Sequence, residues 1–266
     1  MSHYTVAVIT HTGDYDEVVD LLAPYDENLE VESYVYRTRE QIIEDGKACR
    51  EKWLDFIANE NTTKAEVVQW LTEPDYKWLR DLMSAETDDD FYWSEANPDF
   101  LHADGNEYTT YNPDSKWDWY QIGGRWSDSL RDKSGEYSDT LQIKDWDYNY
   151  IDPDDVKYYS RFWDVVVEGM PETEEEKENH TFLTFKNDKY YREKYGNKSE
   201  YIKSMLTFST YAILTPDGEW LAPGEMGWWG CSLADPATEG SWERNFTSLI
   251  DTADPEDYIT IVDCHI

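Results

Sequence analysis

Residues 116–126 read KWDWYQIGGRW, a stretch with three tryptophans, two glycines and an arginine. If it forms a strand, alternation places Trp117 and Trp119 on one face of a sheet. The Gly123-Gly124 pair that follows permits positive φ or a close approach of the backbone, which a side chain would prevent. Arg125 carries a planar guanidinium that suits a carboxylate or a phosphate. The stretch therefore predicts a strand that leads into a binding loop.

Three other segments, residues 4–10, 208–215 and 258–264, are rich in apolar and β-branched residues, which is typical of buried strands. Residues 208–215 are followed by Pro216-Asp217-Gly218, which predicts a hairpin turn. None of these strands can bury its apolar face alone, so we expect one antiparallel sheet with helices on one face, an α+β fold. The strands predicted for this sheet are residues 4–10, 117–123, 208–215 and 258–264.

The long segments between these strands are interpreted as insertions into a single α+β domain that spans residues 1–266. Within residues 38–115, apolar side chains recur at helical spacing, which predicts a mostly helical insertion. Residues 127–205 are turn-rich, acidic at first and then basic, with one further strand predicted at 162–168. Lysines and tyrosines are interleaved over 186–203, which suits either an ordinary helix face or a track for a single nucleic acid strand.

The charge balance bounds the class of partner. The chain has 58 acidic and 23 basic residues and a net charge of −35. This excess repels nucleic acid phosphates and anionic membranes and attracts basic protein surfaces, so we expect no direct binding to nucleic acid or membrane. Alternatively, the acidity only confers solubility or suits a salty cytoplasm. The 13 Trp, 21 Tyr and 8 Phe argue against disorder and predict an aromatic core.

Several common site types are not indicated by the sequence. The three cysteines are widely spaced, and neither a signal peptide nor an apolar stretch of membrane-spanning length is apparent, so we expect a cytoplasmic protein. No His-x-x-x-His or His-Glu-x-x-His spacing occurs, and the Asp-rich runs at 88–90 and 152–155 do not match a calcium-binding loop. We therefore predict no metal and no cofactor.

The last strand predicts a second functional element. Alternation places Asp263 and His265 on one face, where an Asp can orient an imidazole for proton transfer. Cys264 would need a second histidine on its own face to act as a nucleophile. Alternatively, the strand end is solvated and the histidine is passive. No catalytic residue is assigned.

Glycine-rich, tryptophan-rich residues 224–230, GEMGWWG, could hold an indole over a cleft or could only close the core. Arg125 and the glycine amides could bind an anion, or Arg125 could pair with a carboxylate of the fold. We expect Trp119, Gly124, Arg125 and Trp228 to surround one cavity, with Asp263 and His265 at its edge. The candidate binding residues are Trp117, Trp119, Tyr120, Gly123, Gly124, Arg125, Trp126, Trp228, Trp229, Asp263 and His265.

Four motifs together resemble a family of hypothetical proteins encoded in tailed-bacteriophage genomes. They are YDENLEV at 25–31, WDWYQIGGRW at 117–126, GEMGWWG at 224–230 and VDCHI at 262–266, and they span nearly the whole chain. The resemblance implies a phage protein made inside a bacterial host cell. Such proteins commonly redirect host enzymes or block host defence, but the family has no established activity, so no catalytic residue is carried over.

Two functional hypotheses follow. The first is a non-enzymatic acidic protein that binds the basic surface of a host nucleic-acid-acting or defence protein, as a DNA mimic would. The second is a small-molecule or nucleotide-binding protein, or a hydrolase, with a Trp/Arg/His pocket. A mimic requires contiguous negative charge, whereas a pocket protein can scatter it. The acidic surface predicted for the first hypothesis comprises Glu86, Asp88, Asp89, Asp90, Asp152, Asp154, Asp155, Glu174, Glu175 and Glu176. The oligomeric state is not predicted.

Overall fold

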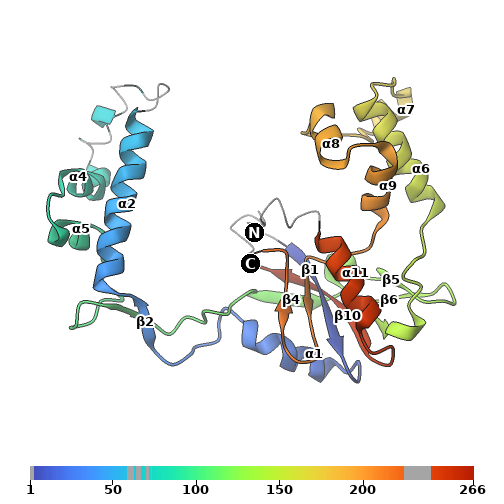
Figure 1. Cartoon of the computed structure of the whole chain (residues 1–266), viewed down its shortest axis with the longest axis horizontal. Helices are drawn as coiled ribbons and strands as arrows, with labels where there is room; N and C mark the ends of the chain where they lie inside the picture. The colour runs from blue at the N-terminus through green and yellow to red at the C-terminus, as the bar shows by residue number, and fades with distance from the viewer. Residues whose placement is uncertain (1–2, 59–62, 64–66, 70–71, 73, 225–240) are drawn as a thin grey trace. The chain divides into compact units, whose positions relative to one another are not determined.

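The computed structural model describes residues 3–58, 63, 67–69, 72, 74–224 and 241–266. The chain divides into two compact units (Figure 1). The first consists of Met1–Glu27 with Asp114–Ile266, and the second is Asn28–Pro113. The second unit covers most of the segment predicted as the insertion 38–115.

A six-stranded sheet forms the centre of the first unit, in the order β4-β10-β1-β8-β9, with β7 also paired to β10. All four segments predicted to share a sheet contribute to it, and the α+β class is confirmed. The prediction of a fully antiparallel sheet is wrong, because β1 pairs with β8 in parallel, which the long crossover connection between them allows. The strands are β1 (His3–Thr10), β4 (Trp119–Ile122), β7 (Thr140–Gln142), β8 (Ala212–Leu214), β9 (Trp220–Leu221) and β10 (Tyr258–His265).

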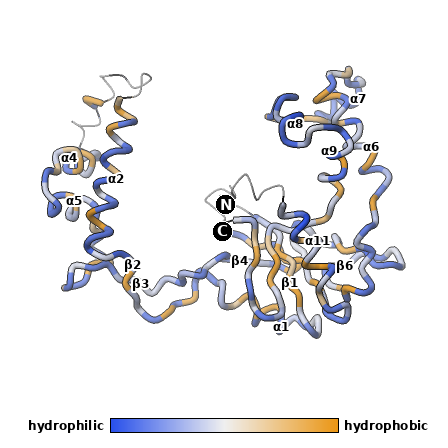
Figure 2. The backbone as a smooth tube through the Cα atoms, viewed as in Figure 1, coloured by the Kyte–Doolittle hydropathy of each residue, from blue (hydrophilic) through white to orange (hydrophobic). Residues whose placement is uncertain are grey.

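The central strands β1 and β10 are apolar on both faces, and each face is covered by a helix. On one face Val6 and Val262 pack with α1 (Tyr15–Leu22), which is followed by the 3-10 turn η1 (Ala23–Tyr25). On the other face Ala7 and Ile261 pack with Phe246 of α11 (Trp242–Thr252). The prediction of helices on one face is therefore wrong. Figure 2 shows the apolar residues concentrated along these strands.

Short elements connect β4 to the rest of the first unit. They are η3 (Gly124–Trp126), β5 (Leu130–Arg131), β6 (Tyr137–Ser138) and η4 (Ile143–Asp145), and β5 pairs antiparallel with β6. The predicted hairpin turn after β8 is confirmed, because β9 returns antiparallel to it. The amide of Gly218 closes this turn by donating to the carbonyl of Thr215 at 2.9 Å.

Residues 153–206 are helical and have an aromatic cluster of their own. The elements are α6 (Pro153–Phe162), a π-helical segment η5 (Trp163–Val167), α7 (Glu174–Glu178), α8 (Asp188–Tyr195) and α9 (Lys198–Leu206). The strand predicted at 162–168 is wrong. Its apolar run is helical because Phe162, Trp163 and Val167 pack with Tyr201 of α9, so tertiary burial overrides the β-propensity of the valines.

The second unit pairs β2 (Tyr34–Arg37) antiparallel with β3 (Glu107–Thr109) beside a set of helices. These are α2 (Arg39–Ala58), the 3-10 turn η2 (Pro74–Tyr76), α4 (Lys77–Ser84) and α5 (Asp88–Glu95). Glu107 is fully buried, and its carboxylate accepts hydrogen bonds from the Arg37 guanidinium at 2.8 and 3.1 Å. This charge-assisted pair joins the strands to the connection after α5, since the amide of Asn97 donates to the same carboxylate.

Candidate functional site

The sheet face beneath α11 becomes polar at one end. Ala7 and Ile261 are buried in its apolar core, and two residues further along Thr5 stands opposite Asp263 and His3 opposite His265. On the other side of β10, Trp119 of β4 pairs with His265. Because paired residues present their side chains to the same face, three strands bring these polar and aromatic groups together.

Asp263 is the buried centre of this group, with 1% of its surface exposed. Its Oδ1 lies 2.7 Å from Nδ1 of His3, and its Oδ2 accepts a hydrogen bond of 3.0 Å from the backbone amide of Arg125. Both carboxylate oxygens therefore have partners, as a buried charge requires. Engagement of Nδ1 leaves Nε2 of His3 without a partner among the described residues.

A second Asp–His pair faces the first. Nδ1 of His265 lies 2.6 Å from Oδ1 of Asp118. The two imidazole rings have centroids 5.0 Å apart at an interplanar angle of 72°. The indole of Trp119, which is 47% exposed, contacts both rings edge-on, at 5.8 Å from His3 and 6.3 Å from His265. We call His3, Asp118, Trp119, Asp263 and His265 the imidazole-pair site.

The Gly123-Gly124 pair lets the loop wrap closely around two carboxylates. Both residues have positive φ, +65° and +55°. A Cβ at Gly123 would lie 2.3 Å from Oδ2 of Asp139, whose Oδ1 accepts a hydrogen bond from the amide of Asp128. A Cβ at Gly124 would likewise lie 2.6 Å from Oδ2 of Asp263, which accepts a hydrogen bond from the amide of Arg125. The loop thus binds internal carboxylates through its backbone, while the side chain of Arg125 is exposed and has no hydrogen bond or ion pair with a described residue.

The other predicted residues of this stretch belong to the two cores. Trp117 is buried on the α1 side, where its Nε1 donates to the carbonyl of Leu22 at 3.2 Å. The prediction that it shares a face with Trp119 is wrong, because β4 begins only at Trp119 and Trp117 makes an isolated bridge to Asp26. Tyr120 also packs on the α1 side, and burial raises its pKa to about 12. Trp126 packs against the α11-side core.

Cys264 is not positioned as a nucleophile. It is fully buried among the α1-side residues, on the opposite face from His265. Burial raises the pKa of its thiol, which disfavours the reactive thiolate. A Cys–His pair is therefore not formed by these residues.

The glycine-rich motif at 224–230 lies outside the described residues, apart from Gly224. Trp228 and Trp229 are among the residues that the structure does not describe. Of the residues predicted to surround one cavity, the structure brings Trp119, Asp263 and His265 together and places Gly124 against Asp263, while the side chain of Arg125 is exposed. His3 and Asp118 join this group and were not predicted.

The predicted acidic clusters coincide with the first turns of three helices, α5, α6 and α7. Carboxylates are favourable there, because they satisfy free amides and oppose the positive end of the helix dipole. Asp90 and Glu176 close capping boxes with Thr87 and Thr173. Asp152 caps α6, and four more residues pair with a nearby cation, namely Asp88, Asp89, Asp154 and Glu174. Only Glu86, Asp155 and Glu175 have no side-chain partner among the described residues.

Within the described ranges, no three His, Cys, Asp or Glu side chains are arranged to hold a metal ion. None of the described helices combines the length and the apolar character that crossing a bilayer requires. Comparison with known proteins finds no matching family model, no matching curated protein and no matching solved structure.

Proposed function

We propose that the chain binds a small polar molecule at the imidazole-pair site and exchanges protons with it. The observation that carries the proposal is the pair of Asp–His contacts, in which both histidines and Asp263 lie on the neighbouring strands β1 and β10, with imidazole centroids 5.0 Å apart. A carboxylate at Nδ1 orients the ring and favours the tautomer whose Nε2 can accept a proton. One imidazole can then act as a base while the other, protonated, acts as an acid.

Each remaining group has a role in this proposal. The exposed indole of Trp119 offers a flat apolar surface beside both rings. The backbone amide of Arg125 donates to Asp263, so its side chain begins at a fixed point near the site, and its guanidinium can pair with an anionic group of the ligand. Asp263 acts through His3 and is therefore a positioning residue.

The acidic interaction hypothesis stays a prediction, together with its phage and host-cell context. Its support is the net charge of −35. Most of the carboxylates named for it cap helices or pair with neighbouring cations, which gives them a local structural reason. The imidazole-pair site instead gathers two imidazoles, each held by a carboxylate, beside the exposed indole of Trp119, and we therefore favour the pocket hypothesis.

The test is a nuclear magnetic resonance screen of the full chain against small carboxylates, phosphates, nucleosides and amines. A ligand of this site should shift the imidazole resonances of His3 and His265, and His265→Gln should abolish the shifts. His180→Asn is the matched control, because His180 is exposed and its positive φ of 49° suits asparagine. If every hit leaves both imidazoles unchanged, the proposal is wrong.

A further inference from the structure

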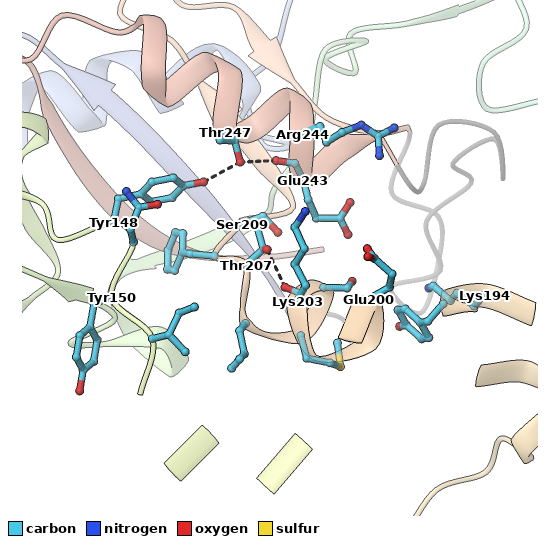
Figure 3. Close-up of a pocket in the computed structure, with 17 residues that line it drawn as sticks. Tyr148, Tyr150, Lys194, Glu200, Lys203, Thr207, Ser209, Glu243, Arg244 and Thr247 are labelled. Carbon is cyan, nitrogen blue, oxygen red and sulfur yellow. Dashed lines mark hydrogen bonds between the residues drawn. The ribbon is translucent and has the colours of Figure 1, made fainter. Parts of the chain in front are cut away.

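A cleft of about 1140 Å³ lies in the first unit between α9 and the first turns of α11. Its walls come from residues 148–151, 194–195, 200, 203–209, 243–244 and 247, and none of them belongs to the imidazole-pair site. Figure 3 shows its lining residues. The volume is slightly above the range for small-molecule pockets, which is several hundred to about 1,000 Å³.

Cations from different elements line this cleft. Lys203 belongs to α9 and Arg244 to α11, and Figure 3 shows both among the lining side chains. In a chain with 58 acidic residues, most described lysines and arginines pair with a carboxylate. Neither Lys203 nor Arg244 has a side-chain partner among the described residues. Glu200 and Glu243 also line the cleft and share this lack of a described ion-pair partner.

Aromatic rings form the second part of the lining. The hydroxyl of Tyr148 lies 2.9 Å from that of Thr247, and its ring centroid is 4.7 Å from that of Trp146. Phe208 packs against the same tryptophan at 5.2 Å. The guanidinium of Arg131 lies 3.9 Å from the ring centroid of Tyr150. These contacts orient the aromatic wall before any ligand binds.

We propose that this cleft binds a nucleoside monophosphate. The base would lie against Tyr148, Tyr150 or Phe208, because flat rings pack favourably on aromatic side chains. The phosphate would pair with Lys203 and Arg244, which are cations without another described partner. A nucleic acid polymer is disfavoured, since the charge of −35 repels an extended polyanion.

A carboxylate beside the proposed phosphate position predicts the sign of a change in affinity. Glu243 lies in the turn that carries Arg244, where its charge opposes a bound phosphate. Glu243→Gln removes this repulsion and should strengthen nucleotide binding, whereas a cationic ligand would bind more weakly to the same variant. The sign of this change therefore separates an anionic ligand from a cationic one.

Isothermal titration calorimetry on the full chain, with AMP, GMP, CMP, UMP and inorganic phosphate in turn, tests the proposal. We expect saturable binding of at least one nucleotide, weakened roughly tenfold by Lys203→Ala and by Arg244→Ala. Lys157→Ala is the matched control, since Lys157 is exposed, pairs with Asp154 and lies outside the cleft. His265→Gln should leave this binding unchanged, which separates it from the imidazole-pair site.

Three results would overturn the proposal. They are no saturable binding of any of the four nucleotides, equal affinity for inorganic phosphate, and binding that survives both cation substitutions. Lys157, Lys203 and Arg244 are exposed, so we expect their alanine variants to fold. Glu243 is half-buried and the side chain of His265 is 13% exposed, and thermal melting checks the folding of every variant. If Glu243→Gln alone lowers the melting temperature, the two alanine variants still decide the outcome.

Discussion

A Cβ atom added at Gly124 would stand 2.5 Å from the Cβ of Asp263. The carboxylate cannot easily move away, because His3 and the amide of Arg125 hold it on two sides. We therefore expect Gly124→Ala to destabilise the first unit by about 2–4 kcal/mol, the combined cost of a positive φ and a forced displacement in a packed region. Urea denaturation followed by tryptophan fluorescence measures this.

Gly218→Ala is the matched control for this substitution. Gly218 also has positive φ, +81°, but no atom lies within 4 Å of an added Cβ. Only the backbone strain should then be felt, about 1–2 kcal/mol. Equal losses for the two variants would show that the approach to Asp263 is not constrained.

Loss of the buried carboxylate should be more costly than loss of the exposed one. Asp263→Ala leaves Nδ1 of His3 and the amide of Arg125 without their partner, so we expect a loss of about 2–4 kcal/mol. Asp118 has a side chain that is 38% exposed, and Asp118→Ala should cost about 1 kcal/mol or less. Similar unfolding free energies for the two variants would contradict this ranking.

The contact between His11 and Asp257 should make stability depend on pH. The hydrogen bond and the charge of Asp257, 2.8 Å away, raise the pKa of His11 above its ordinary value near 6.5. A histidine whose pKa is raised in the folded state stabilises the protein at pH values below its pKa in the unfolded chain. This contribution is lost as the pH rises through the pKa of the folded state.

His11→Gln should therefore lower the melting temperature relative to the parent chain at about pH 5 and have little effect at about pH 9. Calorimetric scans across this range measure the difference. A difference that does not change with pH would show that the protonated imidazole contributes nothing.

The capping box at the start of α5 should stabilise the second unit. Thr87 accepts from the amide of Asp90, and the Asp90 carboxylate accepts in return from the amide of Thr87 at 2.9 Å. Backbone hydrogen bonding from Thr87 also lowers the pKa of Asp90. Thr87→Ala should cost about 1 kcal/mol of unfolding free energy.

Glu86→Ala is the control beside this cap, because Glu86 is exposed and has no side-chain partner among the described residues. It should be neutral within about 0.5 kcal/mol. Comparable destabilisation by both changes would argue against a specific cap, and hydrogen exchange of the α5 amides would localise the effect.

The strands of the sheet could be predicted from local patterns, because the apolar, β-branched runs at residues 4–10 and 258–264 favour a buried strand. The face of the sheet on which Trp117 packs could not be predicted, since it depends on where β4 begins. Asp263 and His265 could be placed on one face by alternation. Their meeting with His3 could not, because it requires the register between strands 260 positions apart.

The helical state of residues 162–168 was missed for a related reason. Three consecutive valines favour a strand locally, but their partners are aromatic residues of α8 and α9, which local propensity does not include. The acidic runs were visible in the sequence, whereas their use as helix caps became apparent only once the helix boundaries were known.

The central position of β10 has a consequence for synthesis on the ribosome. β10 pairs with β1, β4 and β7, so these three strands are synthesised before the strand with which they form hydrogen bonds. Residues 28–113 and the helices of 153–206 contain apolar clusters of their own and can fold before then. Docking of β10 completes the sheet and, in the same event, brings Asp263 to His3, so the paired imidazoles are assembled only in chains whose sheet is complete.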